Sequence, residues 1–158
     1  MIKASLISLG CPKNFVDSDN LMKKLVAAGF SYANAPEDAD LVLVNTCGFI
    51  ESAKQESVSE ILNVTAFAGK RRRKKLVVFG CLAERYSDEL KKEIPEINAI
   101  FGVGADDAIV SYCTGLYEGR GLRTGTAKRP AASLTSGQAY EYLKISEGCD
   151  RGCSYCVI

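Results

Sequence analysis

The chain has 158 residues, of which 20 are Lys or Arg and 19 are Asp or Glu, so its formal net charge is +1. Because 47% of the residues are hydrophobic and 25% are charged, the chain can bury a core, which excludes a disordered or collagen-like protein. The near-neutral charge argues against strong overall attraction to nucleic acid. No apolar stretch approaches the roughly 20 residues of a bilayer span, and no secretion signal is evident. We therefore expect a cytoplasmic protein without membrane contact.

Short β-rich runs alternate with helical patterns along the first part of the chain, which predicts an α/β fold with a doubly wound, mostly parallel sheet. The strand candidates are residues 3–8, 41–45, 75–79 and 99–103, with a short edge strand at 30–32. Two of these runs are apolar throughout, as in central strands that are buried on both faces. We expect the flavodoxin-like strand order 2-1-3-4-5.

Apolar residues at helical spacing predict four helices between and after these strands. The predicted starts are near Asn14, Ser52, Leu82 or Ser87, and Asp106. Asn14 is a candidate for the residue that caps the first helix, and Pro95 ends the third.

The composition changes after the last predicted helix. Residues 118–137 are rich in Gly, Thr, Ser and Arg and have little periodicity, which predicts an interdomain linker. We therefore expect one domain over residues 1–117 and the start of a second over residues 138–158, opening with a strand at 140–145.

The chain contains seven cysteines and no histidine. Without a secretion signal, such thiols are more often metal ligands, reactive groups or core residues than disulfide partners. The absence of histidine removes the central residue of Ser-His and Cys-His hydrolases. Any metal site in this chain must therefore be dominated by thiolates.

Three of the cysteines, Cys11, Cys47 and Cys81, each follow a predicted strand closely. In doubly wound folds the carboxyl ends of the strands meet at one edge, where ligands bind, so we expect the three thiols to converge there. Three thiolates favour an iron–sulfur cluster with one iron left for a non-protein ligand. A zinc site and three buried core cysteines are the alternatives.

A second set, Cys149, Cys153 and Cys156, has the spacing C-x3-C-x2-C directly after a predicted strand. This loop is too short for all three thiols to be core residues, and it can wrap around one cluster. The alternative is a structural zinc site completed by Cys113 or by a ligand outside this sequence. Cys113 itself lies on an apolar helical face, which indicates a packing role.

The second motif resembles the cluster-binding loop of the radical S-adenosylmethionine (SAM) enzymes, with Tyr155 at the aromatic position. Residues 8–18, 45–53 and 80–86 resemble the N-terminal domain of the methylthiotransferases of that superfamily. The resemblance covers the whole chain, and Pro12-Lys13 is similar to the RimO branch of the family.

This resemblance implies two four-iron four-sulfur (4Fe-4S) clusters. Cys149, Cys153 and Cys156 would bind the cluster that takes SAM, with Tyr155 near the adenine. An electron from an external donor would cleave SAM and yield a radical that abstracts hydrogen from the substrate. The cysteines at 11, 47 and 81 would hold the second cluster, which supplies or relays the sulfur.

The implied activity is the addition of a methylthio group to the β-carbon of an aspartate in a ribosomal small-subunit protein. The tRNA-adenosine branch of the same family is the alternative substrate class. No catalytic residue is identified beyond the cluster ligands. Because most of the SAM-binding barrel lies outside this sequence, we expect residues 1–158 alone to be inactive.

Two other hypotheses stay open. A structural zinc module would bind metal without redox chemistry, and a flavodoxin-like nucleotide binder would not need the cysteines. The basic run at residues 70–75 is interpreted as a solvated turn on the edge opposite the cysteines, with a ribosomal RNA contact as the alternative.

Overall fold

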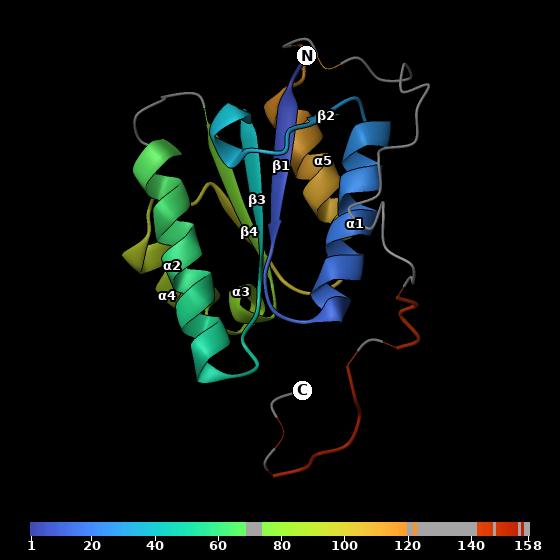
Figure 1. Ribbon diagram of the computed structural model, residues 1–158, viewed down its shortest axis with the longest axis vertical. Coiled ribbons are helices and arrows are strands. Elements are labelled where there is room, and N and C mark those ends of the chain that lie inside the picture. The colour runs from blue at the N-terminus through green and yellow to red at the C-terminus, as the bar shows by residue number, and fades with distance from the viewer. Residues whose placement is uncertain (69–73, 120–121, 123–141, 147, 155, 157–158) are drawn as a thin grey trace.

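The computed structural model describes residues 1–68, 74–119, 122, 142–146, 148–154 and 156. A central sheet is covered by helices on both faces (Figure 1). The elements in chain order are β1 (Lys3–Ser8), α1 (Pro12–Ala27), β2 (Ser31–Tyr32), the 3-10 turn η1 (Pro36–Asp38), β3 (Leu41–Thr46), α2 (Glu51–Ala68), β4 (Lys75–Gly80), α3 (Cys81–Arg85), α4 (Ser87–Glu93), β5 (Ala99–Phe101) and α5 (Asp106–Leu116).

The sheet has five parallel strands in the order β2-β1-β3-β4-β5, which confirms the predicted flavodoxin-like arrangement. Leu43 of β3 lies opposite Leu6 of β1 and Val77 of β4 in the register of the sheet. The strands β1, β3 and β4 are therefore consecutive neighbours. Their carboxyl ends form one continuous stretch of the sheet edge.

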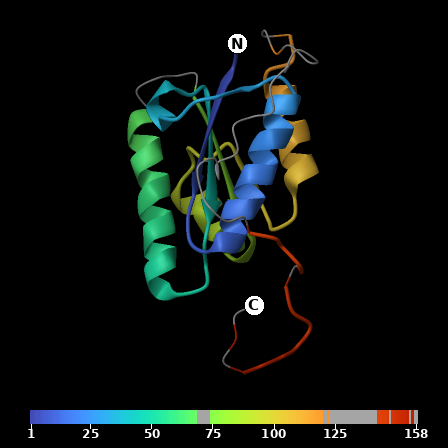
Figure 2. The same ribbon diagram turned by 45° about the vertical axis from the view of Figure 1, so that its right-hand side comes forward.

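The apolar strands divide their side chains between two cores. Leu43 and Val77 pack with residues of α1 and α5 on one face of the sheet. Val44 and Val78 pack on the other face, where α2 and α4 contribute buried side chains. Figures 1 and 2 show the same two helical layers from different directions. The uninterrupted hydrophobic runs in β3 and β4 result from this burial on both faces.

Three boundaries differ from the sequence predictions. The first helix begins at Pro12, and Cys11 occupies the position before it without a capping side-chain bond, so the assignment of Asn14 as the cap is wrong. The predicted third helix is two short helices, because Tyr86 between them has φ −124° and ψ 34°, outside the helical range. The last strand ends at Phe101, since the amide of Val103 donates to Glu84 Oε2 (2.8 Å) instead of to a strand.

The segment predicted to open the second domain carries no strand where it is described. Tyr142 to Ser146 pair with no other strand in the described part of the chain. A barrel strand obtains its hydrogen bonds from neighbouring strands, and no described segment supplies such a neighbour. The predicted linker lies almost entirely outside the described residues.

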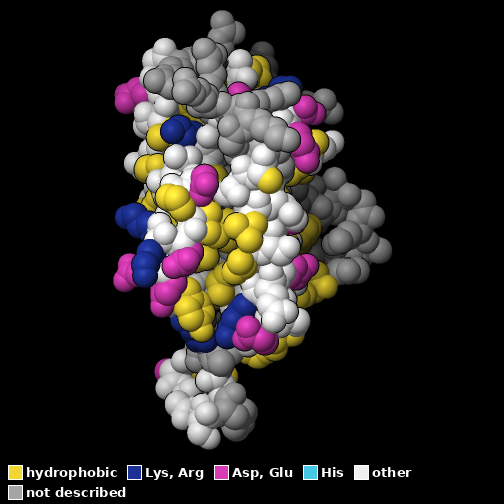
Figure 3. Space-filling view, turned by 90° about the vertical axis from the view of Figure 1, so that its left-hand side faces the viewer, with side chains coloured by type: hydrophobic (Ala, Val, Ile, Leu, Met, Phe, Trp, Pro, Cys, Tyr) yellow, Lys and Arg dark blue, Asp and Glu magenta, His cyan; other side chains and the backbone are white. Residues whose placement is uncertain are grey.

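The surface over α2 mixes hydrophobic and charged side chains (Figure 3). Leu62 of α2 is 49% exposed on the surface. No helix among the described residues is both long enough and apolar enough to cross a bilayer.

Candidate metal centre

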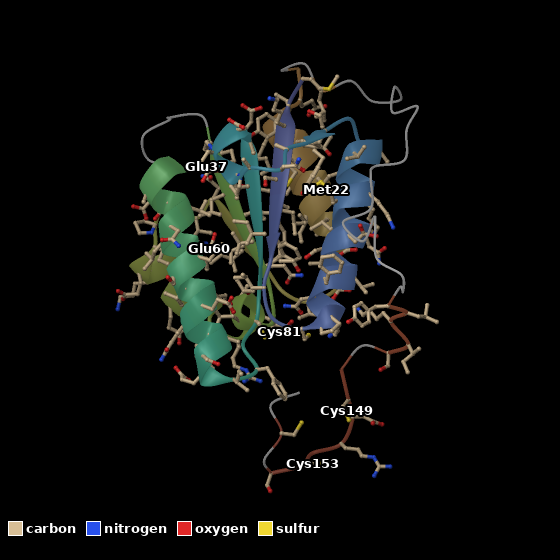
Figure 4. All side chains as sticks on the ribbon, viewed as in Figure 1. Met22, Glu37, Glu60, Cys81, Cys149 and Cys153 are labelled. Atoms are coloured by element: carbon tan, nitrogen blue, oxygen red, sulfur yellow. The ribbon has the colours of Figure 1, made fainter. Side chains whose placement is uncertain are left out.

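The three widely spaced cysteines all lie at the carboxyl edge of the sheet. Cys11 follows β1 and precedes α1, Cys47 follows β3 directly, and Cys81 begins α3 directly after β4. Figure 4 shows Cys81 at this end of the molecule. The predicted meeting of these three strand ends at one edge is therefore confirmed.

Glycines bring the three loops into direct contact. Gly10 has φ +87°, and a Cβ added there would lie 2.7 Å from Sγ of Cys47 and still closer to its Cβ. A Cβ added at Gly48 would lie 3.2 Å from the Cα of Leu82, the residue after Cys81. The loop of Cys11 thus touches the side chain of Cys47, and the loop of Cys47 touches the start of α3.

A buried amide joins the first two loops. The Nδ2 group of Asn14 donates to the carbonyl oxygens of Leu9 (2.9 Å) and Thr46 (3.1 Å). Its Oδ1 lies 3.8 Å from Sγ of Cys11, which donates to it as a thiol. Asn45 donates in turn to the carbonyl oxygen of Asn14 (2.8 Å). These bonds fix the backbone on both sides of the contact between Gly10 and Cys47.

Two hydroxyl groups hold the remaining backbone. Thr46 Oγ1 donates to the carbonyl oxygen of Phe79 (2.7 Å) and accepts from the amide of Ala83 (3.2 Å), which links the ends of β3 and β4. The buried Ser57 accepts from the amide of Cys47 (3.0 Å) and donates to its carbonyl oxygen (3.2 Å). The backbone at Cys47 is therefore anchored to α2.

The thiols differ in access to solvent. Cys11 is exposed, Cys81 is partly buried, and Cys47 is 5% exposed. A hollow beside Cys81 has a cavity volume of about 10 Å³, which is enough for about one water. Its lining residues are Lys13, Asn14, Asp17, Asn45, Phe79, Gly80, Cys81, Val103, Gly104 and Asp106. The hollow in this structure therefore holds nothing larger than a water.

The donor set fits an iron–sulfur cluster better than a single metal ion. Among the described residues, no three Cys, Asp or Glu side chains converge closely enough to hold one ion. In a 4Fe-4S cluster each thiolate binds a different iron, so its ligands stand farther apart than the ligands of one ion. Three thiols on neighbouring loops are the kind of donor that an iron–sulfur cluster takes, and the chain has no histidine to compete with them.

The second cysteine set lies at the same end of the molecule. Cys149, Cys153 and Cys156 are exposed, and the amide of Cys156 donates to the carbonyl oxygen of Cys153 (3.0 Å). Figures 1, 2 and 4 show this segment beyond the carboxyl edge of the sheet. Nζ of Lys144 lies 2.6 Å from Oδ1 of Asp17 in α1 and ties the segment to the first domain. Tyr155 lies outside the described residues.

Cys113 takes no part in either set. It lies in α5, fully buried in the core beside α1, which confirms its interpretation as a packing residue. Burial raises the pKa of its thiol from 9.0 to about 12. The alternative in which Cys113 completes a zinc site with the exposed cysteines is therefore wrong.

Sequence reasoning missed the polar residues that hold the cysteine loops. Asn45 and Thr46 interrupt the apolar run of β3 at its end, and this is a signal that could have identified them. Ser57 follows Cys47 by ten residues and has no such signal, because its role depends on how α2 returns over the sheet.

Replacing Gly10 with Ala tests the contact between the first two cysteine loops. We expect a loss of unfolding free energy of about 1–2 kcal/mol for the left-handed backbone and roughly 1–3 kcal/mol more for the clash with Cys47. Urea unfolding measures the loss. Alkylation of Cys47 should also become faster, because the added methyl group pushes its side chain outward.

The matched control is Gly104→Ala. Gly104 also has a positive φ, +74°, but an added Cβ meets nothing within 4 Å. This substitution should lower the unfolding free energy only by the cost of the left-handed backbone. The alkylation rate of Cys47 should stay unchanged. Equal effects of the two substitutions would contradict the described contact.

The pKa of Cys113 predicts a pH dependence of stability. The unfolded thiol loses its proton near pH 9 and the folded one near pH 12, so the unfolded state binds fewer protons in this range. Stability should therefore be intact below pH 9 and fall above it, by at most about 1.4 kcal/mol per pH unit. Comparing the slopes for wild type and Cys113→Ala between pH 8 and pH 10.5 isolates this thiol; parallel slopes would contradict the prediction.

Known proteins are similar to this sequence over nearly all of its length. Residues 3–102 match the model described as uncharacterized protein family UPF0004. Ribosomal protein uS12 methylthiotransferase RimO of Aquifex aeolicus is 46% identical over 157 residues, covering 99% of this chain and 33% of that protein. RimO of Thermodesulfovibrio yellowstonii is 44% identical, covering 98% of this chain and 35% of that protein.

The chain thus spans about a third of the length of the curated relatives it matches. The family match covers most of the α/β domain, and the relatives extend the similarity through the second cysteine set. The chain belongs to protein family UPF0004, as a RimO-like N-terminal part.

Proposed function

We propose that this chain is the N-terminal part of a radical SAM methylthiotransferase. The modified atom is the β-carbon of an aspartate in a ribosomal small-subunit protein. The observation that carries the proposal is the meeting of Cys11, Cys47 and Cys81 at one sheet edge, on loops that touch. The 46% identity to a protein named as a uS12 methylthiotransferase supports the choice of substrate.

Each cysteine set holds one 4Fe-4S cluster in this proposal. Cys11, Cys47 and Cys81 bind the first through their thiolates, and Cys149, Cys153 and Cys156 bind the second. Three ligands leave one iron of each cluster open to a non-protein group. The clusters and SAM supply the redox and sulfur-transfer chemistry when bound, with an electron from an external donor. Tyr155 is assigned to the adenine side of SAM.

Two features of the fold suit this assignment. The first cysteine set lies on backbone that Asn14, Thr46 and Ser57 hold by hydrogen bonds, so the backbone that carries these thiols is ordered without a cluster. The second set is exposed and lies beyond the same edge. Both sets therefore lie at one end of the molecule, and Cys47 is the least exposed of the six thiols.

The rival classes have less support. A flavodoxin-like nucleotide binder gives no reason for three cysteines to follow three adjacent strand ends. A structural zinc module cannot use Cys113 as its fourth ligand, because Cys113 is buried in the core. A tRNA substrate is the alternative within the family. The names of the relatives favour the ribosomal protein, because they specify uS12.

The ribosomal RNA contact stays a prediction, because most of the basic run lies outside the described residues. Its end is described: Lys75 begins β4 at the amino edge, opposite the cysteines. Nζ of Lys74 donates to the carbonyl oxygens of Pro36 and Glu37, both at 2.6 Å. The ammonium group of Lys74 thus donates to backbone carbonyl groups, which fits the interpretation of the basic run as a turn.

Anaerobic reconstitution with iron and sulfide tests the two-cluster arrangement. We expect about eight irons per full-length chain, and about four when either cysteine set is changed to Ala. Iron analysis and the visible absorbance of the clusters measure this. Cys113→Ala is the matched control and should keep about eight irons, since Cys113 lies in the core. Colourless binding of zinc instead of iron would contradict the proposal.

The substrate is tested with the full-length protein that contains this chain. Incubation with SAM, a reductant and a sulfide source should add one methylthio group to the ribosomal protein uS12 and leave tRNA unmodified. Mass spectrometry of the protein and nucleoside analysis of the tRNA distinguish the two. Modification of tRNA alone would contradict this substrate and assign the chain to the tRNA-modifying branch of the family.

A further inference from the structure

Asn14 is a buried polar residue to which the cluster chemistry assigns no role. It is 3% exposed and lies in the first turn of α1, three residues after Cys11. Its side chain does not cap the helix. Instead it contacts the segments that carry Cys11 and Cys47.

The two hydrogens of its amide bond to two different loops. One acceptor is the carbonyl oxygen of Leu9, two residues before Cys11, and the other is the carbonyl oxygen of Thr46, directly before Cys47. The distances are 2.9 and 3.1 Å, which are ordinary for strong N–H···O bonds. One planar group therefore fixes the backbone beside both cysteines.

We propose that Asn14 is a positioning residue that holds the Cys11 and Cys47 loops at the separation that cluster binding requires. The inference rests on the proposed function, namely that these two cysteines bind the same cluster. Asn14 touches neither iron nor SAM in this proposal. It acts through the backbone of its two neighbours.

The chemistry of the amide explains why the position needs Asn. Two carbonyl oxygens must be satisfied at once in a buried place, and an unpaired buried carbonyl is costly. A serine has one hydrogen to donate, and an ionised aspartate has none. The bond from the Cys11 thiol to Oδ1 belongs to the metal-free state, since an iron-bound thiolate has no hydrogen to donate. The two bonds from Nδ2 are independent of that change.

The test replaces Asn14 with Asp, which has nearly the same shape but no N–H group. The chain carries Ala at 149, 153 and 156, so that iron binds to the first set alone. After reconstitution with iron and sulfide, we expect the resistance of the cluster to a chelator to fall roughly 10- to 100-fold, the usual effect of losing a group that orients metal ligands. We also expect the electron paramagnetic resonance spectrum of the reduced cluster to change.

Ser18→Ala is the matched structural control. Ser18 is fully buried and bonds to Ser8 (2.9 Å) and Asn45 (3.0 Å), one turn farther along α1. It belongs to the same polar network, but each of its two partners is one residue farther from the cysteine than the carbonyl groups that Asn14 holds. Its replacement should lower stability in urea and leave chelator resistance and the spectrum unchanged. Asn63→Asp on the surface of α2 controls for the added charge.

The outcomes separate the two proposals. If the parent chain with Asn14 binds no cluster, the proposed function fails. If the parent binds a cluster and Asn14→Asp binds it with equal resistance and an unchanged spectrum, only the positioning role is overturned. Should Asn14→Asp not fold, Asn14→Ser is measured in its place, because it removes one donor without adding charge, and the same loss is expected. Equal losses in Ser18→Ala would also overturn the inference.

Discussion

The arrangement of this molecule depends on the parallel pairing of three consecutive strands. Ser8 of β1 lies opposite Asn45 of β3, and Asn45 lies opposite Phe79 of β4. Neighbouring strands are about 4.8 Å apart, so the residues that come after them leave the sheet side by side, however distant they are in sequence. Cysteines more than thirty residues apart are brought to one edge of the sheet in this way. The backbone hydrogen bonds of the sheet, not the thiols, establish this proximity.

Buried polar side chains restrict the arrangement of the three cysteine loops more than sheet pairing alone would. Asn14, Asn45, Thr46 and Ser57 are buried at or beside it. In the described part of the chain, no buried side-chain nitrogen or oxygen lacks a hydrogen-bond partner. Because an unpaired buried polar group costs roughly 1–3 kcal/mol, moving one loop would leave several groups unsatisfied at once. The polar network therefore favours one arrangement of the three loops over neighbouring ones that the apolar core would tolerate.

Features set by periodicity and topology could be predicted from the sequence, whereas features that depend on particular contacts could not. The apolar runs of β3 and β4 identified central strands, and their order placed Cys11, Cys47 and Cys81 on one edge. An Asn near a helix start usually caps the helix, but the amide of Asn14 bonds instead to carbonyl groups of other segments. The early end of β5 depends on Glu84 from a different element. Such bonds between distant segments leave no periodic trace in the sequence.

The three thiols of the first set differ in their exposure to solvent. Cys47 is buried beneath Gly10, Cys81 is partly buried, and Cys11 is exposed. The hollow beside Cys81 has room for about one water. The exposed second cysteine set lies beyond the same edge, and the Lys144–Asp17 ion pair keeps its segment near α1. The exposed thiol of Cys11 and the second cysteine set therefore lie at the same end of the molecule, whereas the side chain of Cys47 is enclosed by the loops of the sheet edge.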